Sequence, residues 1–81
     1  MPRYVDGQID WDRYRADLRR YQRTHGLNNA ALARRLHVSA AALTRYCAGE
    51  RLPTTEVFVY SVLLMDRDLR DYVAVQPTRA A

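Results

Sequence analysis

Residues 26–49 read GLNNAALARRLHVSAAALTRYCAG, and this stretch decides the fold. Asn28 and Ser39 each precede a short run with helical spacing, where a side-chain oxygen caps the first backbone amides of a helix. Gly26 and Gly49 each follow such a run, where a left-handed residue ends a helix. We therefore predict a helix of about two turns after Asn28 and a helix of about nine residues between Ser39 and Gly49. The turn between them is so tight that the two helices must pack nearly perpendicular.

Three further helices are expected around this pair. The first, from the cap Asp10 to about His25, carries one apolar stripe of Trp11, Tyr14, Leu18 and Tyr21. The fourth follows Pro53, is capped by Thr54 or Thr55 and is the most apolar; the fifth is short, starting at Asp66 or Asp68 and running through Tyr72. The prediction is an all-α, five-helix domain over residues 10–75, with an N-terminal arm over 1–9 and a C-terminal tail over 76–81.

Composition restricts the class of protein. A chain of 81 residues with one cysteine, Cys47, forms one domain without an internal disulfide, and no stretch approaches a membrane span. The acidic, aromatic N-terminus is unlike a signal peptide, so we expect a cytoplasmic protein. No nucleophile is paired with a base, no histidine or cysteine cluster has metal-ligand spacing, and no glycine-rich phosphate loop follows a strand. We expect no enzyme activity, cofactor, metal, membrane partner or small-molecule ligand.

Positive charge is concentrated in the middle of the chain. Residues 13–51 hold nine arginines against two acids, Asp17 and Glu50, which leaves seven positive charges. Residues 1–12 and 52–81 are each slightly acidic. An arginine-rich helix face is often only a solvated surface, but here the charge coincides with the predicted pair of helices. This coincidence favours a polyanionic partner.

The pattern from Leu18 to Leu69 resembles the lambda-repressor-like helix-turn-helix domain of phage and bacterial regulators, also called the Cro-type or xenobiotic-response-element-type family. The resemblance rests on Gly26-Leu27-Asn28-Asn29, Leu32-Ala33-Arg34-Arg35-Leu36, Val38-Ser39, Leu43-Thr44-Arg45-Tyr46, Gly49 and Pro53. It implies that the third helix enters the major groove of double-stranded DNA while the second crosses the backbone. The helix-turn-helix is thus formed by the second and third helices.

The resemblance also implies roles for matched residues. Base contacts would come from Ser39, Ala40, Ala41, Thr44 and Arg45, phosphate contacts from Asn29, Arg34, Arg35 and Arg51, and a minor-groove contact from the arm at Arg3. A dimer surface, if one forms on DNA, would use Tyr60, Leu64, Leu69, Tyr72 and Val75. A monomer is the alternative.

The chain departs from the family pattern at two places. Ala40 and Ala41 stand where relatives often carry longer polar side chains, and an alanine offers only a methyl group to a thymine methyl. Direct base reading therefore depends on Arg45, which either forms a bidentate contact to guanine or only binds phosphate. His37 stands where the family usually has glycine, so we expect a histidine with positive φ in the turn, or else a phosphate contact.

The aromatic residues have two interpretations. Tyrosine and tryptophan interleaved with arginine are able to stack on the bases of single strands. Trp11, Tyr14 and Tyr21 share one helical face, however, and Tyr46 matches a core position, so we interpret these residues as core.

Two functions follow from these observations. The first is a sequence-specific double-stranded DNA-binding transcriptional regulator, most simply a small phage or prophage repressor that occupies an operator. The second is a protein-interaction module with the same fold, such as an antitoxin, antirepressor or polymerase-binding factor, which the alanine run at 40–42 favours.

Overall fold

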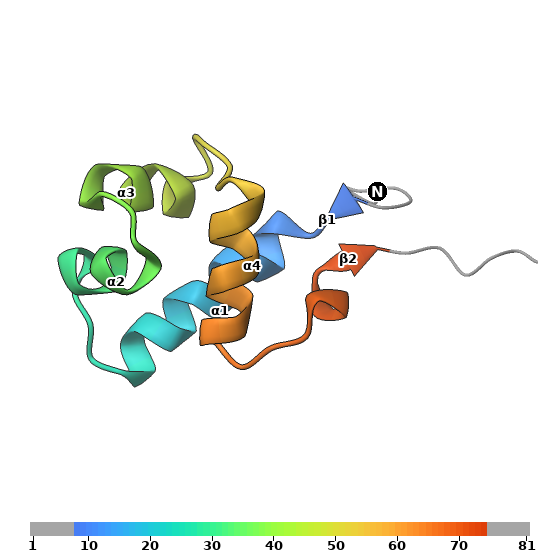
Figure 1. Cartoon of the computed structure of the whole chain (residues 1–81), viewed down its shortest axis with the longest axis horizontal. Coiled ribbons are helices and arrows are strands. Elements are labelled where there is room, and N and C mark those ends of the chain that lie inside the picture. The colour runs from blue at the N-terminus through green and yellow to red at the C-terminus, as the bar shows by residue number, and fades with distance from the viewer. Residues whose placement is uncertain (1–7, 75–81) are drawn as a thin grey trace, which may run out of the picture.

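The structure, a computed structural model, describes residues 8–74. The elements in chain order are β1 (Gln8–Ile9), α1 (Trp11–Thr24), α2 (Asn29–Leu36), α3 (Ala40–Ala48), α4 (Thr55–Leu64), the 3-10 turn η1 (Leu69–Asp71) and β2 (Val73–Ala74). Figure 1 shows α2 and α3 together at one end, the two short strands at the other, and α1 and α4 in between. The described fold is therefore helical apart from one pair of two-residue strands.

Every α-helix begins at a side-chain cap, as predicted. The caps and their hydrogen bonds are Asp10 Oδ1 from Arg13 N at 3.1 Å, Asn28 Oδ1 from Ala31 N at 2.8 Å, Ser39 Oγ from Ala42 N at 3.0 Å and Thr54 Oγ1 from Val57 N at 3.2 Å. Each bond satisfies one of the backbone amides that a helix start leaves without an intrahelical acceptor. Of the two candidates before α4, Thr54 is the cap.

Left-handed residues follow the first three α-helices. Gly26 has φ 62° and Gly49 has φ 80°, as their positions predicted. His37 ends α2 with φ 60° and ψ 40°, which confirms the expected positive φ in the turn. Asp66, just after α4, has φ 58°, which the sequence did not predict.

The left-handed conformation of His37 predicts which of two substitutions at this position is the more stable. Because a left-handed residue crowds its Cβ, His37→Gly should be more stable than His37→Ala by about 1 kcal/mol. Both variants lose the ring, which lies 5.3 Å from the Tyr60 ring, so the comparison isolates the backbone. The measurement is urea unfolding.

The matched control is exposed Arg34 inside α2, where glycine should be less stable than alanine by about 1 kcal/mol. Equal stabilities of the two position-37 variants would show that the turn relaxes to another conformation.

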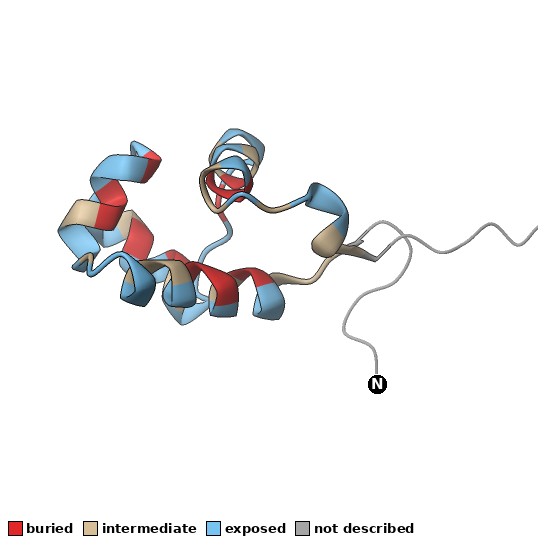
Figure 2. Cartoon of the chain, turned by 90° about the horizontal axis from the view of Figure 1, so that it is seen from below, coloured by how far each residue is buried: buried red, intermediate tan, exposed pale blue. Residues whose placement is uncertain are grey.

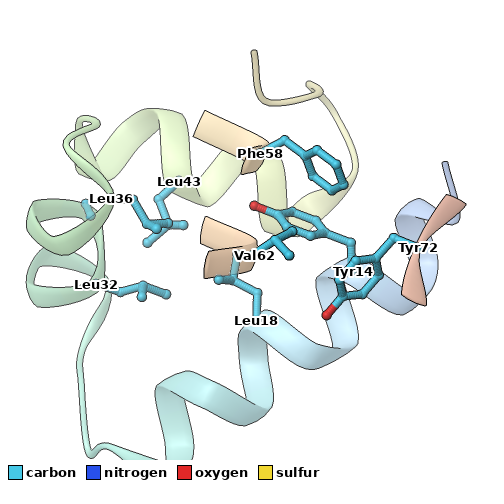
Figure 3. Packing of buried hydrophobic residues seen from close by; sticks show 9 residues of the cluster. Tyr14, Leu18, Leu32, Leu36, Leu43, Phe58, Val62 and Tyr72 are labelled. Atoms are coloured by element: carbon cyan, nitrogen blue, oxygen red, sulfur yellow. The ribbon is translucent and has the colours of Figure 1, made fainter. Parts of the chain in front are cut away.

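The core lies between α1, α2, α3 and α4. Figure 3 shows Leu18 of α1, Leu32 and Leu36 of α2, Leu43 of α3 and Val62 of α4 converging on it. Figure 2 shows that buried residues lie on the helix faces that look inward, whereas the outer faces are exposed. The apolar helix α4 contributes Phe58 and Val62 to this core, although Leu63 on its outer side is 68% exposed.

Aromatic rings close the core at the end near the strands. Tyr14 is fully buried, with its ring centroid 5.2 Å from Phe58 and 5.9 Å from Tyr72. Trp11 contacts both Tyr14 and Phe58 edge to face. Tyr46, which was expected at a core position, is 6% exposed. These contacts support the interpretation of the aromatic stripe as core.

Two buried tyrosine hydroxyls have polar partners. Ser61 Oγ donates to the Phe58 carbonyl at 2.8 Å, so the Tyr14 hydroxyl donates to Ser61 Oγ at 2.6 Å. The Tyr72 hydroxyl donates to Asp17 Oδ2 at 2.7 Å, across 55 positions of the chain. Both bonds satisfy groups that would otherwise be costly to bury.

Three expectations for the ends of the domain need correction. The fifth helix is only the 3-10 turn η1, because Asp68 and Asp71 cap each other across it and Tyr72 O accepts a hydrogen bond from Asp10 N at 2.6 Å. That bond leads into the pairing of Ile9 with Val73, so residues 8–9 are a strand and not part of an arm. Tyr72 is 1% exposed, so its side chain cannot form a dimer surface.

Alkaline pH should weaken the fold through these tyrosines. Burial, followed by the hydrogen bond to Asp17, raises the pKa of Tyr72 above the ordinary 10.0, and burial also raises the pKa of Tyr14. The unfolded chain releases these protons near pH 10 while the folded chain holds them. Stability is therefore fully present below about pH 10 and falls above it, by up to about 1.4 kcal/mol per pH unit for each tyrosine.

Urea unfolding from pH 8 to pH 11 checks this expectation. Tyr72→Phe should reduce the alkaline loss of stability by the contribution of one tyrosine, because it removes the hydroxyl whose pKa burial and Asp17 raise. An unchanged slope in Tyr72→Phe would contradict the assignment.

Candidate nucleic-acid interface

A tight turn joins α2 to α3. Ala33 of α2 is 2% exposed, and its carbonyl accepts a hydrogen bond from Val38 N at 3.0 Å. With His37 left-handed, the chain reverses within three residues and α3 begins directly after Ser39. Leu36 and Leu43 then fill the angle between the two helices. Together α2, the turn and α3 form a helix-turn-helix.

One face of α3 takes no part in the core. Leu43 and Tyr46 are buried, whereas all five residues predicted to contact bases are exposed: Ser39, Ala40, Ala41, Thr44 and Arg45. The Thr44 hydroxyl donates to the Ala40 carbonyl at 3.0 Å, so it is left as an acceptor. Ser39 Oγ accepts the cap bond and keeps its proton as a donor. The face thus presents methyl groups, two hydroxyls and one guanidinium.

The start of α2 presents an amide side chain. Asn29 is the first residue of α2 and is exposed. Its Oδ1 accepts a hydrogen bond of 2.8 Å from Gln22 Nε2 in the last turns of α1. The sequence had not singled out Gln22, and the only signal for it was a polar residue one turn before Gly26.

The predicted phosphate-binding arginines are exposed but differ in their surroundings. Arg34, Arg35 and Arg51 all lie at the surface. Arg35 Nη1 donates to the Tyr21 hydroxyl at 2.8 Å, which ties this guanidinium to α1. Arg51 lies in the segment between α3 and α4. Arg3 and Val75, the predicted arm and dimer residues, lie outside the described residues.

Asp17 and the arginines of α2 and α3 differ in their burial. Asp17, one of the two acids in residues 13–51, is buried and accepts from Tyr72, and its Oδ2 lies 3.5 Å from Arg67 Nη2 and 3.9 Å from Arg13 Nε. The arginines of α2 and α3, by contrast, are all exposed. The charged side chains within α2 and α3 are therefore all positive and all exposed.

Cys47 lies on α3, but its surroundings do not make the thiol reactive. It is half-buried on α3, and burial raises the pKa of its thiol, although Arg19 and Arg15 act in the opposite direction. A raised pKa keeps the thiol protonated and poorly reactive at neutral pH. Residues 8–74 contain no group of three histidine, cysteine or acidic residues arranged to hold a metal ion. None of the helices in this range is long and apolar enough to span a bilayer.

Comparison with known proteins identifies the family. The model of the family described as "Helix-turn-helix domain" matches residues 13–72. The chain therefore belongs to the helix-turn-helix domain family, which confirms the resemblance seen in the sequence.

One solved structure illustrates the fold. The chain is similar to the crystal structure of a transcriptional regulator from Listeria innocua, with a TM-score of 0.68 and 23% sequence identity over 95% of this chain and 68% of that chain. This similarity establishes a shared fold. No protein with a curated function matches the chain.

Proposed function

We propose that the chain is a sequence-reading, double-stranded DNA-binding transcriptional regulator, and that it acts as a small phage or prophage repressor of the Cro type. The observation that carries this proposal is the exposed face of α3, which the core does not use and which carries Arg45. A helix-turn-helix places such a face against base edges in the major groove. The family membership and the regulator of similar fold support it.

Each exposed residue has a proposed part in binding. Arg45 reads a guanine through two hydrogen bonds, and the methyl groups of Ala40 and Ala41 contact thymine methyls. Ser39 donates to, and Thr44 accepts from, nearby bases. Asn29, Arg34, Arg35 and Arg51 contact phosphates and fix the register of the helix on the duplex. Bound at an operator in the cytoplasm, the protein blocks access to a promoter.

Dimerisation on DNA is part of the proposal. Tyr60 and Leu69 are 41% and 40% exposed, whereas Leu64 packs partly against the core. The strongly exposed Leu63 extends this apolar surface of α4 and had not been included. Sedimentation equilibrium with and without operator DNA tests the surface. A concentration-independent monomer that binds a single half-site would exclude it.

Selection from a randomised duplex library tests sequence reading. We suggest about 150 mM salt, where non-specific phosphate binding is weakened. An enriched motif supports the regulator, and a palindrome supports a dimer. A folded protein that enriches no motif would reject sequence-specific binding.

Salt dependence should report the phosphate contacts. If five to seven phosphates are neutralised per protomer, log Kd should change with log salt with a slope of about 5 to 6 in magnitude. Fluorescence anisotropy with a labelled duplex at several salt concentrations measures the slope. A slope near zero would contradict a phosphate-based interface.

The interaction module remains a second candidate because of one observation. Ala40 and Ala41 are both exposed at the start of α3 and offer no hydrogen bond to a base. If Arg45→Ala and Arg51→Ala leave DNA affinity unchanged while the domain stays folded, this second candidate replaces the first. A loss of affinity favours the regulator.

A further inference from the structure

The turn between α1 and α2 contains a hydrogen bond that orients the side-chain amide of Asn29. Gln22 Nε2 donates to Asn29 Oδ1 at 2.8 Å, and the main-chain carbonyl of Gln22 accepts from Leu27 N at 2.9 Å. Gln22 is half-buried and Asn29 is exposed. The turn therefore fixes the backbone of Gln22, and the Gln22 side chain donates to the exposed amide of Asn29.

The direction matters because the two sides of an amide differ. An asparagine side chain accepts through Oδ1 and donates through Nδ2, whereas a phosphate oxygen only accepts. With Oδ1 engaged by Gln22, the Nδ2 group is the part of Asn29 that remains for a ligand. The reversed amide would present an oxygen to the phosphate and repel it.

We propose that Gln22 is a positioning residue for DNA binding: it orients the Asn29 amide so that its NH₂ group faces a backbone phosphate. This inference rests on the proposed function. Gln22 itself touches no DNA in this arrangement. The neighbouring caps support it, because Asn28 Oδ1 already holds Ala31 N, so the Asn29 side chain is not needed to cap the helix.

Two substitutions separate orientation from charge. Gln22→Glu replaces the donor by a carboxylate that only accepts, so Asn29 must turn its Nδ2 inward and its oxygen outward. Gln22→Met keeps the length of the side chain but leaves the amide free to rotate. Thr24→Glu is the matched control, because it adds the same charge in the same last turns of α1 at an exposed residue with no bond to Asn29.

The experiment measures the Kd of the full chain for a mixed-sequence duplex of about 20 base pairs, long enough for two half-sites. Asn29→Ala should weaken binding about tenfold, as expected for one hydrogen bond to a charged group. Gln22→Met should weaken binding about threefold, because the freed amide must be ordered on binding. Gln22→Glu should weaken it about tenfold more than Thr24→Glu.

The double-mutant cycle decides the inference. In an Asn29→Ala background, Gln22→Met should have no further effect, and Gln22→Glu should have no more effect than Thr24→Glu. Urea unfolding of each variant corrects for any unfolded fraction. Equal losses from Gln22→Glu and Thr24→Glu, additive losses in the cycle, or no effect of Asn29→Ala would overturn the inference while DNA binding stands. A wild-type chain that binds no duplex would instead contradict the proposed function, and the inference with it.

Discussion

Replacing Arg45 by alanine should weaken binding to the selected operator by about 5- to 150-fold, the loss of one bidentate guanine contact worth about 1–3 kcal/mol. Arg45 is exposed on the outer face of α3, and the core residues Leu43 and Tyr46 of the same helix point the other way. The loss should be largest on the operator and small on unrelated duplexes. Anisotropy titrations on both kinds of DNA measure it.

The control is Arg70→Ala on η1. This side chain is 87% exposed and pairs with Asp68 at 3.1 Å, so the substitution removes the same charge outside the proposed interface. Arg51→Ala, at a proposed phosphate contact, should instead weaken all duplexes alike and lower the salt slope by about one. If Arg45→Ala behaves like Arg51→Ala, Arg45 binds phosphate only. If it behaves like Arg70→Ala, α3 is not the reading helix.

Leu43→Ala should lower the free energy of unfolding by about 3–5 kcal/mol, because it leaves a cavity where α3 meets the core. Leu43 is fully buried and belongs to the same cluster as Leu32, Leu36 and Val62. A small domain is stable by only about 5–15 kcal/mol in total, so this one change removes a large share. Chemical unfolding followed by circular dichroism measures the difference.

Leu63→Ala is the matched control for this second prediction. It removes the same atoms from a leucine that is 68% exposed on α4, and the cost should stay within about 0.5 kcal/mol. Similar losses at the two positions would mean that the outer side of α4 is covered in solution. A small loss at Leu43 would contradict the packing of α3 on the core.

The part of the candidate site that follows from helical periodicity could be predicted from the sequence. Leu43 and Tyr46 marked the inner face of α3, so its outer residues had to be exposed, and the structure confirms this for Thr44 and Arg45. The contacts of these residues with DNA stay predictions, because exposure follows from the fold whereas contact depends on the partner. Gln22 escaped notice because its hydrogen bond to Asn29 spans a turn and has no periodic signal.

The sequence by itself determined the α-helices and their ends. Caps such as Asn28 and Ser39 and stops such as Gly26 and Gly49 act within a few residues, so local physical chemistry is enough to place them. The left-handed His37 was predictable only through the family resemblance, because it stands where that family usually has glycine.

The tertiary structure alone decided how the two ends of the domain close. The Tyr72 hydroxyl is satisfied in the core because Asp17, 55 positions earlier, accepts a hydrogen bond from it, and the pairing of Ile9 with Val73 depends on the same approach. The short η1 in place of a fifth helix follows from that closure, since the chain must turn back toward β1 after Asp71. Interactions between segments this far apart leave no periodic pattern in the sequence, because neither segment forms them until the helices between have packed.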